Sequence, residues 1–222
     1  GMKHLFPAIV AVVVQPGVEF GDENIARYNR VETTALSRAI AQHPGIVLEG
    51  HSTDYQPPKQ LKEMGEDGVA ILKVGPALTF AAREGLFALS MIEHELIPKE
   101  NRANLERIIE EKMMKNPKNW EVYYKGTEAE QELKRKYSLS DRSRYYFADA
   151  DIQNAIEKLY HNLDSVHIPL GLLHQFMPTQ YIKIRDGKLV LKASELVKDH
   201  VIDRIEDYNY ATKFNYMIGG IF

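Results

Sequence analysis

An unbroken apolar run at residues 8–14 sets the first limit on the fold. The run is rich in β-branched valine and is closed by Pro16-Gly17. Because it is continuous rather than alternating, it predicts a strand that is covered on both faces, as in a parallel sheet. It is far shorter than the ~20 residues that cross a bilayer, and its flanks do not resemble a cleaved secretory signal. We expect no membrane segment, a cytoplasmic location and a buried parallel strand.

Strands and helices continue to alternate after this run. A helical face formed by Val31, Ala35, Leu36, Ala39 and Ile40 is stopped by His43-Pro44-Gly45. The elements expected next are a strand at 46–49, a helix at 57–65, a strand at 69–74 and a long helix at 76–97. Such alternation predicts an α/β fold with a parallel sheet and right-handed crossovers.

The pattern becomes helical from Asn101 onward, with no further strand expected. Two helical faces have apolar residues three or four apart: Ile152, Ile156, Leu159 and Leu163 on one, and Val197, Val201, Ile205 and Tyr208 on the other. We therefore expect two domains packed together, a strand-and-helix part at 2–98 and a helical extension at 99–222. Gly1 is expected to be a tag remnant before a start at Met2.

Charge and cysteine content exclude several classes of protein. The net charge is −3 with lysine and arginine scattered along the chain, so nucleic acid is not an expected partner. The chain has no cysteine, so any metal ligands must be His, Asp or Glu. It also has no G-x-x-x-x-G-K-[ST], G-x-G-x-x-G or G-x-S-x-G motif, which disfavours a sugar kinase and a serine hydrolase.

Polar residues follow each predicted strand, at the edge where parallel α/β folds build their sites. Glu19, His51 and Lys73 are the catalytic candidates. A neutral imidazole at a strand end can ligate a divalent metal or transfer protons near pH 7, but His51 is also readily explained as a hydrogen-bonded structural residue. Lys73 is equally compatible with a lysine that extends to solvent.

Several groups could hold a phosphate. Ser52, Thr53 and the backbone N–H groups beside them are candidates, as is the helix N-terminus after Gly75, near Thr79. Arg142 could reach a phosphate too, although we favour a structural role for it in a capped helix start at residues 140–144.

Other conspicuous residues are interpreted as structural. Met113-Met114, Trp120 and Tyr123-Tyr124 are expected in core or interface packing rather than at a cofactor. The charged run from Glu128 to Lys136 is expected to be a solvated helix face.

Four long segments carry a resemblance that covers nearly the whole chain. They are Val13-Val-Gln-Pro-Gly-Val-Glu-Phe20, Gly50-His-Ser-Thr-Asp-Tyr-Gln56, Ala70-Ile-Leu-Lys-Val-Gly-Pro-Ala-Leu-Thr-Phe80 and Tyr137-Ser-Leu-Ser-Asp-Arg142. With these segments the chain closely resembles the Z-type, non-catalytic subunit of tagatose-1,6-bisphosphate aldolase.

The resemblance implies a fold and a site. The fold would be the C-terminal part, strands six to eight, of a class II aldolase (β/α)₈ barrel, followed by an α-helical extension. In the related catalytic aldolases a zinc ion polarises the ketose-phosphate carbonyl. By resemblance His51 would be a zinc ligand, and Ser52, Thr53, Gly75 and Thr79 the phosphate-holding side. The other ligands and the acid-base carboxylate would come from strands that this chain lacks.

The resemblance also implies partners and leaves three functions open. The first is an accessory protein that supports a Y-type catalytic subunit in galactitol or N-acetylgalactosamine catabolism. The second is a metal-dependent aldolase, or a protein that binds a sugar bisphosphate, in its own right. The third is a truncated gene product without an independent role. Three strands cannot close a barrel, so we expect homo-oligomers or the helical extension to cover the open edges.

Overall fold

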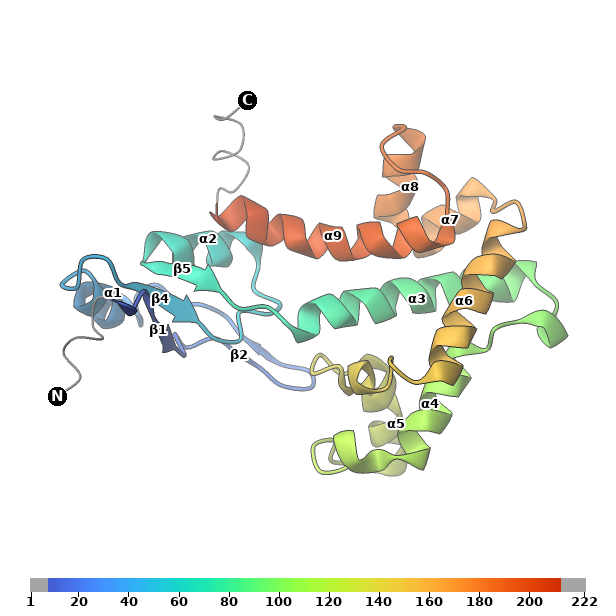
Figure 1. Ribbon diagram of the computed structural model, residues 1–222, viewed down its shortest axis with the longest axis horizontal. Helices are drawn as coiled ribbons and strands as arrows, with labels where there is room; N and C mark the ends of the chain where they lie inside the picture. The colour runs from blue at the N-terminus through green and yellow to red at the C-terminus, as the bar shows by residue number, and fades with distance from the viewer. Residues whose placement is uncertain (1–7, 213–222) are drawn as a thin grey trace. The chain divides into compact units, whose positions relative to one another are not determined.

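The computed structural model describes residues 8–212 and has an α/β fold, with mostly helices and a small parallel sheet (Figure 1). Within that range the chain forms two compact units, one from residues 8–77 and 204–212 and the other from residues 78–203. The first unit therefore takes in the C-terminal end of the last helix. The predicted domain boundary at residue 98 stays a prediction. No helix among the described residues is long and apolar enough to span a membrane.

The sheet of the first unit has the parallel pairing expected from the sequence. Its strands are β1 (Ala11–Val14), β4 (Val47–Gly50) and β5 (Val69–Leu72), in the order β1-β4-β5. Val13 pairs with Glu49, and Gly50 pairs with Leu72. All three carboxyl ends therefore lie at one edge of the sheet.

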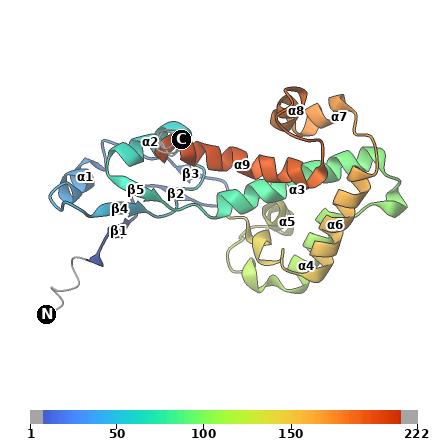
Figure 2. The same cartoon turned by 45° about the horizontal axis from the view of Figure 1, so that its top comes forward.

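Two short helices and the end of α9 cover one face of this sheet. They are α1 (Thr34–Ile40), α2 (Pro58–Glu66) and residues 204–212 of α9 (Ala193–Thr212) (Figure 2). The core they share contains Leu48, Leu61, Met64, Val69 and Ala211. Helix α2 begins with proline at its first position, where the missing N–H costs nothing. Val31 lies ahead of α1 and is exposed, as are Ala35 and Ala39, so the predicted face was wrong at these three positions and only Leu36 and Ile40 pack against the core.

Strand β1 is not buried, which corrects the prediction from its apolar run. Val12 is 46% exposed and Val13 is 55% exposed. The reason is its position: β1 is an edge strand that pairs only with β4 among the described residues. Continuous apolar runs are typical of strands that are covered on both faces and paired on both edges. The exposed side of β1 therefore carries the valines that are usual in a protein interior.

A short hairpin between β1 and α1 was not predicted. It consists of β2 (Glu19–Phe20) and β3 (Ile25–Ala26), which pair antiparallel. Gln56 fastens it, because its side-chain amide donates to the carbonyl of Ala26 at 2.9 Å and accepts from the N–H of Tyr28 at 2.9 Å. Strands of two residues are too short for a periodic pattern, so local sequence could not reveal them.

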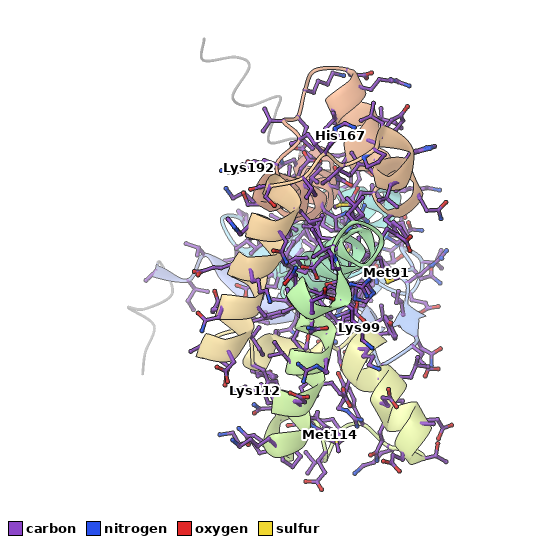
Figure 3. The ribbon with its side chains drawn as sticks, turned by 90° about the vertical axis from the view of Figure 1, so that its right-hand side faces the viewer. Met91, Lys99, Lys112, Met114, His167 and Lys192 are labelled. Carbon is purple, nitrogen blue, oxygen red and sulfur yellow. The ribbon has the colours of Figure 1, made fainter. Side chains whose placement is uncertain are left out.

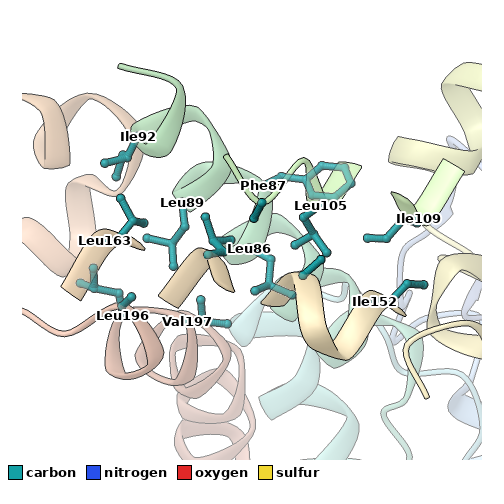
Figure 4. Packing of buried hydrophobic residues seen from close by; sticks show 14 of the residues in the cluster. Leu86, Phe87, Leu89, Ile92, Leu105, Ile109, Ile152, Leu163, Leu196 and Val197 are labelled. Atoms are coloured by element: carbon teal, nitrogen blue, oxygen red, sulfur yellow. The ribbon is translucent and has the colours of Figure 1, made fainter. Parts of the chain in front are cut away.

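The second unit is entirely helical in its described residues. Its elements are α3 (Pro76–Leu96, from Leu78), η2 (Lys99–Asn101), α4 (Leu105–Lys115), η3 (Pro117–Asn119), α5 (Glu128–Tyr137), η4 (Arg142–Tyr145), α6 (Ala150–Asp164), α7 (Leu170–Phe176), α8 (Pro178–Arg185) and α9 as far as Asp203. Leucine and isoleucine side chains from α3, α4, α6 and α9 interlock in its core (Figure 4). The absence of strands after Asn101 agrees with the sequence prediction over the described residues.

Packing in this unit confirms some predicted faces and corrects others. Ile152, Leu159 and Leu163 are buried as expected. On α9, Val197 is buried as expected, whereas Ile205, which lies in the part of α9 that belongs to the first unit, is exposed, so that part of the second face was wrong. Met113, Trp120 and Tyr124 are core residues, but Met114 is half-exposed, as is Tyr123. Figure 3 labels Met114 on α4, together with Lys112.

The charged helix α5 is not solvated along its whole length. Arg135 is only 5% exposed. Its guanidinium donates two hydrogen bonds to Glu110 Oε1, at 2.8 and 2.6 Å, and stacks over the ring of Trp120. The prediction of a solvated face was therefore wrong at this position, because a paired arginine can bury its planar head against an aromatic ring.

Candidate functional site

The loop after β4 begins with two polar residues at the carboxyl edge of the sheet. His51 is exposed, and its backbone N–H donates to the carbonyl of Val14 at 2.9 Å. Its Nδ1 lies 2.7 Å from the hydroxyl oxygen of Ser52. Ser52 and Tyr55 have left-handed backbone, with φ of 60° and 61°. Non-glycine residues pay a conformational cost there, and such residues concentrate at ligand sites.

The hydroxyl of Thr53 faces the interior rather than this edge. Thr53 is fully buried, and its hydroxyl donates to the carbonyl of Lys73 at 2.8 Å. Tyr208, near the end of α9, donates to the carbonyl of Thr53 at 3.0 Å. Burial raises the pKa of the Tyr208 phenol, and the nearby Asp54 carboxylate adds to the rise. Through these bonds Thr53 links the residue that follows β5 to the C-terminal part of α9.

Asp54 occupies the N-terminus of α3. Its Oδ1 accepts from the N–H of Gly75 at 2.9 Å and from the N–H of Ala77 at 2.8 Å. The side chain is nearly fully buried. The first N–H groups of a helix form an anion site, and here a carboxylate of the same chain fills it. Any phosphate at Gly75 would have to compete with that carboxylate.

Sequence reasoning missed Asp54 as the cap of α3. The two hydrogen-bonded amides lie 21 and 23 residues further along the chain, outside the range of a local capping motif. Two features of the sequence could have indicated this cap: Asp54 follows the strand β4, and Gly75-Pro76 begins the helix that follows the next strand, β5.

Glu19 and Lys73, the other catalytic candidates, are held by neighbours on the first unit. The Gln15 side-chain amide donates to Glu19 Oε2 at 2.8 Å. Lys73 Nζ lies 3.3 Å from Glu49 Oε1, and the lysine side chain is about half exposed, at 47%. Lys73 therefore forms a partly solvated ion pair with the adjacent strand, which agrees with the view that it extends towards solvent.

Thr79 and Arg142 belong to the second unit. Arg142 Nη1 donates to the carbonyl of Asn119 at 3.0 Å, and its guanidinium lies 3.1 Å from the ring centroid of Tyr123. These contacts support the structural interpretation of Arg142. Its position is in a 3₁₀ helix after Asp141, which has left-handed backbone.

Asp141 directly precedes the 3₁₀ helix η4 but does not cap it with its side chain. Its Oδ1 accepts from Arg83 Nε at 3.0 Å and from the Ser143 hydroxyl at 2.8 Å, and no side-chain cap bond is present. A helix does begin within the predicted segment 140–144, as the 3₁₀ helix η4, but the predicted side-chain cap is absent. A buried arginine from α3 competed successfully for the carboxylate, because an ionised partner makes the stronger hydrogen bond.

A zinc site does not fit the described residues. No group of three or more His, Asp or Glu side chains converges anywhere in residues 8–212. His51 has the Ser52 hydroxyl beside its ring rather than a second metal ligand. A catalytic zinc needs three protein ligands, so this part of the chain cannot hold one alone.

Comparison with known proteins decides the family. A family model described as D-tagatose-1,6-bisphosphate aldolase subunit GatZ/KbaZ-like matches residues 1–213. The chain belongs to this family. A similar crystal structure, titled a probable tagatose 6 phosphate kinase from Sinorhizobium meliloti 1021, has a TM-score of 0.90 and 43% identity. That match covers 94% of this chain and 54% of the other, so the GatZ/KbaZ-like chain spans about half the length of that relative.

Proposed function

We propose that this GatZ/KbaZ-like chain acts as part of the accessory, non-catalytic subunit of a tagatose-1,6-bisphosphate aldolase, and that it supports a Y-type catalytic subunit. The match to the family model over residues 1–213 carries this proposal. The pathway served would be galactitol or N-acetylgalactosamine catabolism.

The same proposal gives the sheet its place in a larger fold. We propose that β1, β4 and β5 are the last three strands of a (β/α)₈ barrel. The similarity to a longer chain, of which this match covers only 54%, supports this, as does the exposure of Val12 and Val13 on an edge strand. An exposed apolar edge is an aggregation hazard in a lone domain, so a further protein surface should cover it.

The strand-end loop is the proposed contact with a sugar bisphosphate. His51 and Ser52 offer an imidazole and a hydroxyl at the carboxyl edge of the sheet, while the donors of Thr53 and Gly75 are engaged inside the chain. In the alternative function, a metal-dependent aldolase, His51 would be one zinc ligand, and the other ligands and the acid-base carboxylate would come from elsewhere. Kinase chemistry has no support in the sequence, which lacks a phosphate-binding loop of the P-loop type.

Reconstitution with a Y-type subunit tests the proposal. The chain, the Y-type subunit and their mixture are assayed for cleavage of tagatose-1,6-bisphosphate and for co-elution. Val13→Lys places a charge on the exposed edge strand beside Glu49, its cross-strand neighbour. Leu133→Lys is the matched control, because Leu133 is similarly exposed (57%) but lies on α5 in the other unit.

The accessory role predicts that the mixture is more active than the Y-type subunit alone and that only Val13→Lys reduces the gain. If instead the chain alone binds zinc and cleaves the substrate, and His51→Ala abolishes both, the chain is an enzyme in its own right. No gain in activity and no co-elution would reject the accessory role.

A further inference from the structure

The strand-end loop, residues 51–56, consists of buried anchors and of residues that reach the surface. Thr53, Asp54 and Gln56 are at most 5% exposed, whereas the other three residues are exposed or half-buried. Each buried residue is hydrogen-bonded to a different element: Thr53 to α9, Asp54 to the start of α3 and Gln56 to the hairpin. All of these bonds lie within the first unit. The anchors therefore fix the course of the residues between them.

Two residues of the loop have a backbone conformation that depends on these anchors. Ser52 and Tyr55 are left-handed, with φ of 60° and 61°, and they lie on either side of Thr53-Asp54. Left-handed backbone is unfavourable for a residue with a Cβ, and it persists only where the surrounding structure imposes it. If an anchor were removed, Ser52 would be free to return to a right-handed or extended conformation.

Tyr208 is the anchor closest to Ser52. Its phenol donates to the carbonyl of Thr53 at 3.0 Å, and its oxygen lies 3.3 Å from the Thr53 hydroxyl oxygen. The ring packs against the hydrophobic core of the first unit. Because Thr53 directly follows Ser52, a rigid aromatic ring thus holds the residue next to the strained one.

The surface groups that this anchor affects are the Ser52 hydroxyl and the His51 imidazole. His51 Nδ1 lies 2.7 Å from the Ser52 hydroxyl oxygen. The His51 backbone is tied separately to β1, since its N–H donates to the carbonyl of Val14 at 2.9 Å. A change of φ at Ser52 would therefore move its hydroxyl away from the imidazole while His51 stayed with the sheet.

We propose that Tyr208 is a positioning residue for the strand-end loop. Acting through Thr53, it holds Ser52 in the left-handed conformation in which the Ser52 hydroxyl and the His51 imidazole face a sugar bisphosphate together. This inference rests on the contact with a sugar bisphosphate proposed above. Tyr208 does not touch the ligand itself, because its hydroxyl is engaged by Thr53.

Nuclear magnetic resonance of the full chain tests the positioning step without any ligand. The coupling between the N–H and Hα protons of Ser52, with its Cα and Cβ shifts, reports its φ in the wild type, in Tyr208→Phe and in Tyr210→Phe. Tyr210→Phe is the matched control, because Tyr210 lies on the same helix, is 57% exposed and contacts Lys62 rather than the loop. We expect Tyr208→Phe to shift the equilibrium away from left-handed Ser52 by about three- to tenfold, as suits the loss of one hydrogen bond. The control should keep the wild-type φ.

Calorimetric titration with tagatose-1,6-bisphosphate tests the consequence for binding, well below the melting temperature of each variant. A smaller population of the binding conformation raises the apparent Kd in proportion, so we expect a Kd up to about tenfold higher for Tyr208→Phe and an unchanged Kd for Tyr210→Phe. The proposal is overturned if Ser52 keeps its wild-type φ in Tyr208→Phe, if the Kd of that variant equals that of the wild type, or if both variants lose affinity alike. A wild type that does not bind the sugar bisphosphate overturns the contact itself, and the φ of Ser52 in Tyr208→Phe then decides separately whether Tyr208 holds the loop.

Discussion

Replacing Asp54 with alanine would free the N-terminus of α3. The carboxylate accepts from the Gly75 and Ala77 amides at 2.9 and 2.8 Å and is nearly fully buried. Each hydrogen bond to a charged group contributes about 1.5–3 kcal/mol, and the favourable position at a helix N-terminus is part of that gain. Allowing for water that enters to solvate the freed amides, we expect a loss of about 3 kcal/mol in the free energy of unfolding.

The matched variant Asp54→Asn keeps a side-chain oxygen as acceptor and removes only the charge. Its expected loss is smaller, about 1 kcal/mol. Urea unfolding gives the stability of both variants, and amide hydrogen exchange reports the Gly75 and Ala77 N–H groups directly. Inorganic phosphate should stabilise Asp54→Ala more than the wild type, because the emptied helix end can accept an anion.

An unfolding free energy within about 0.5 kcal/mol of wild type, with unchanged exchange at both amides, would refute this reasoning. The two hydrogen bonds of Asp54 would then add nothing to the stability of α3.

Three further predictions concern packing, a helix end and pH. Gly50→Ala should destabilise by about 1–3 kcal/mol in thermal unfolding, because its Cβ would lie 2.8 Å from Val69 Cγ1, whereas Gly21→Ala meets nothing within 4 Å and should be near neutral. Tyr208→Phe should cost about 1–2 kcal/mol and speed exchange at the end of α9, and unchanged exchange would contradict its anchoring role. Burial raises the pKa of Glu106 in the folded state, so the wild type loses stability as pH rises through that pKa. Glu106→Gln should therefore be more stable than wild type at pH 7, with a difference that vanishes below about pH 4 and is measured by thermal unfolding across pH.

Elements with a clear periodic pattern were predictable from the sequence. Strands β1, β4 and β5 and the long helix α3 lie close to their expected positions. Each has an apolar pattern that ends near a glycine or a proline. The burial of β1 was not predictable in the same way. Its apolar composition matches a fully covered strand, but cover depends on neighbours that a local pattern does not contain.

Contacts between distant residues account for most of what was missed. Asp54 caps a helix that begins more than twenty residues later, and Tyr208 reaches Thr53 across 155 residues. Arg83 on α3 donates to the carboxylate of Asp141, 58 residues further along the chain. The residues next to each of these side chains in the sequence do not indicate its partner. The partner depends on how the chain folds.

The accessory role stands or falls on one comparison: the rate of tagatose-1,6-bisphosphate cleavage by a Y-type subunit with and without this chain. We predict little or no cleavage by the chain alone and a higher rate in the mixture than with the Y-type subunit alone. An unchanged rate in the mixture, or turnover by the chain in the absence of the Y-type subunit, would contradict the account.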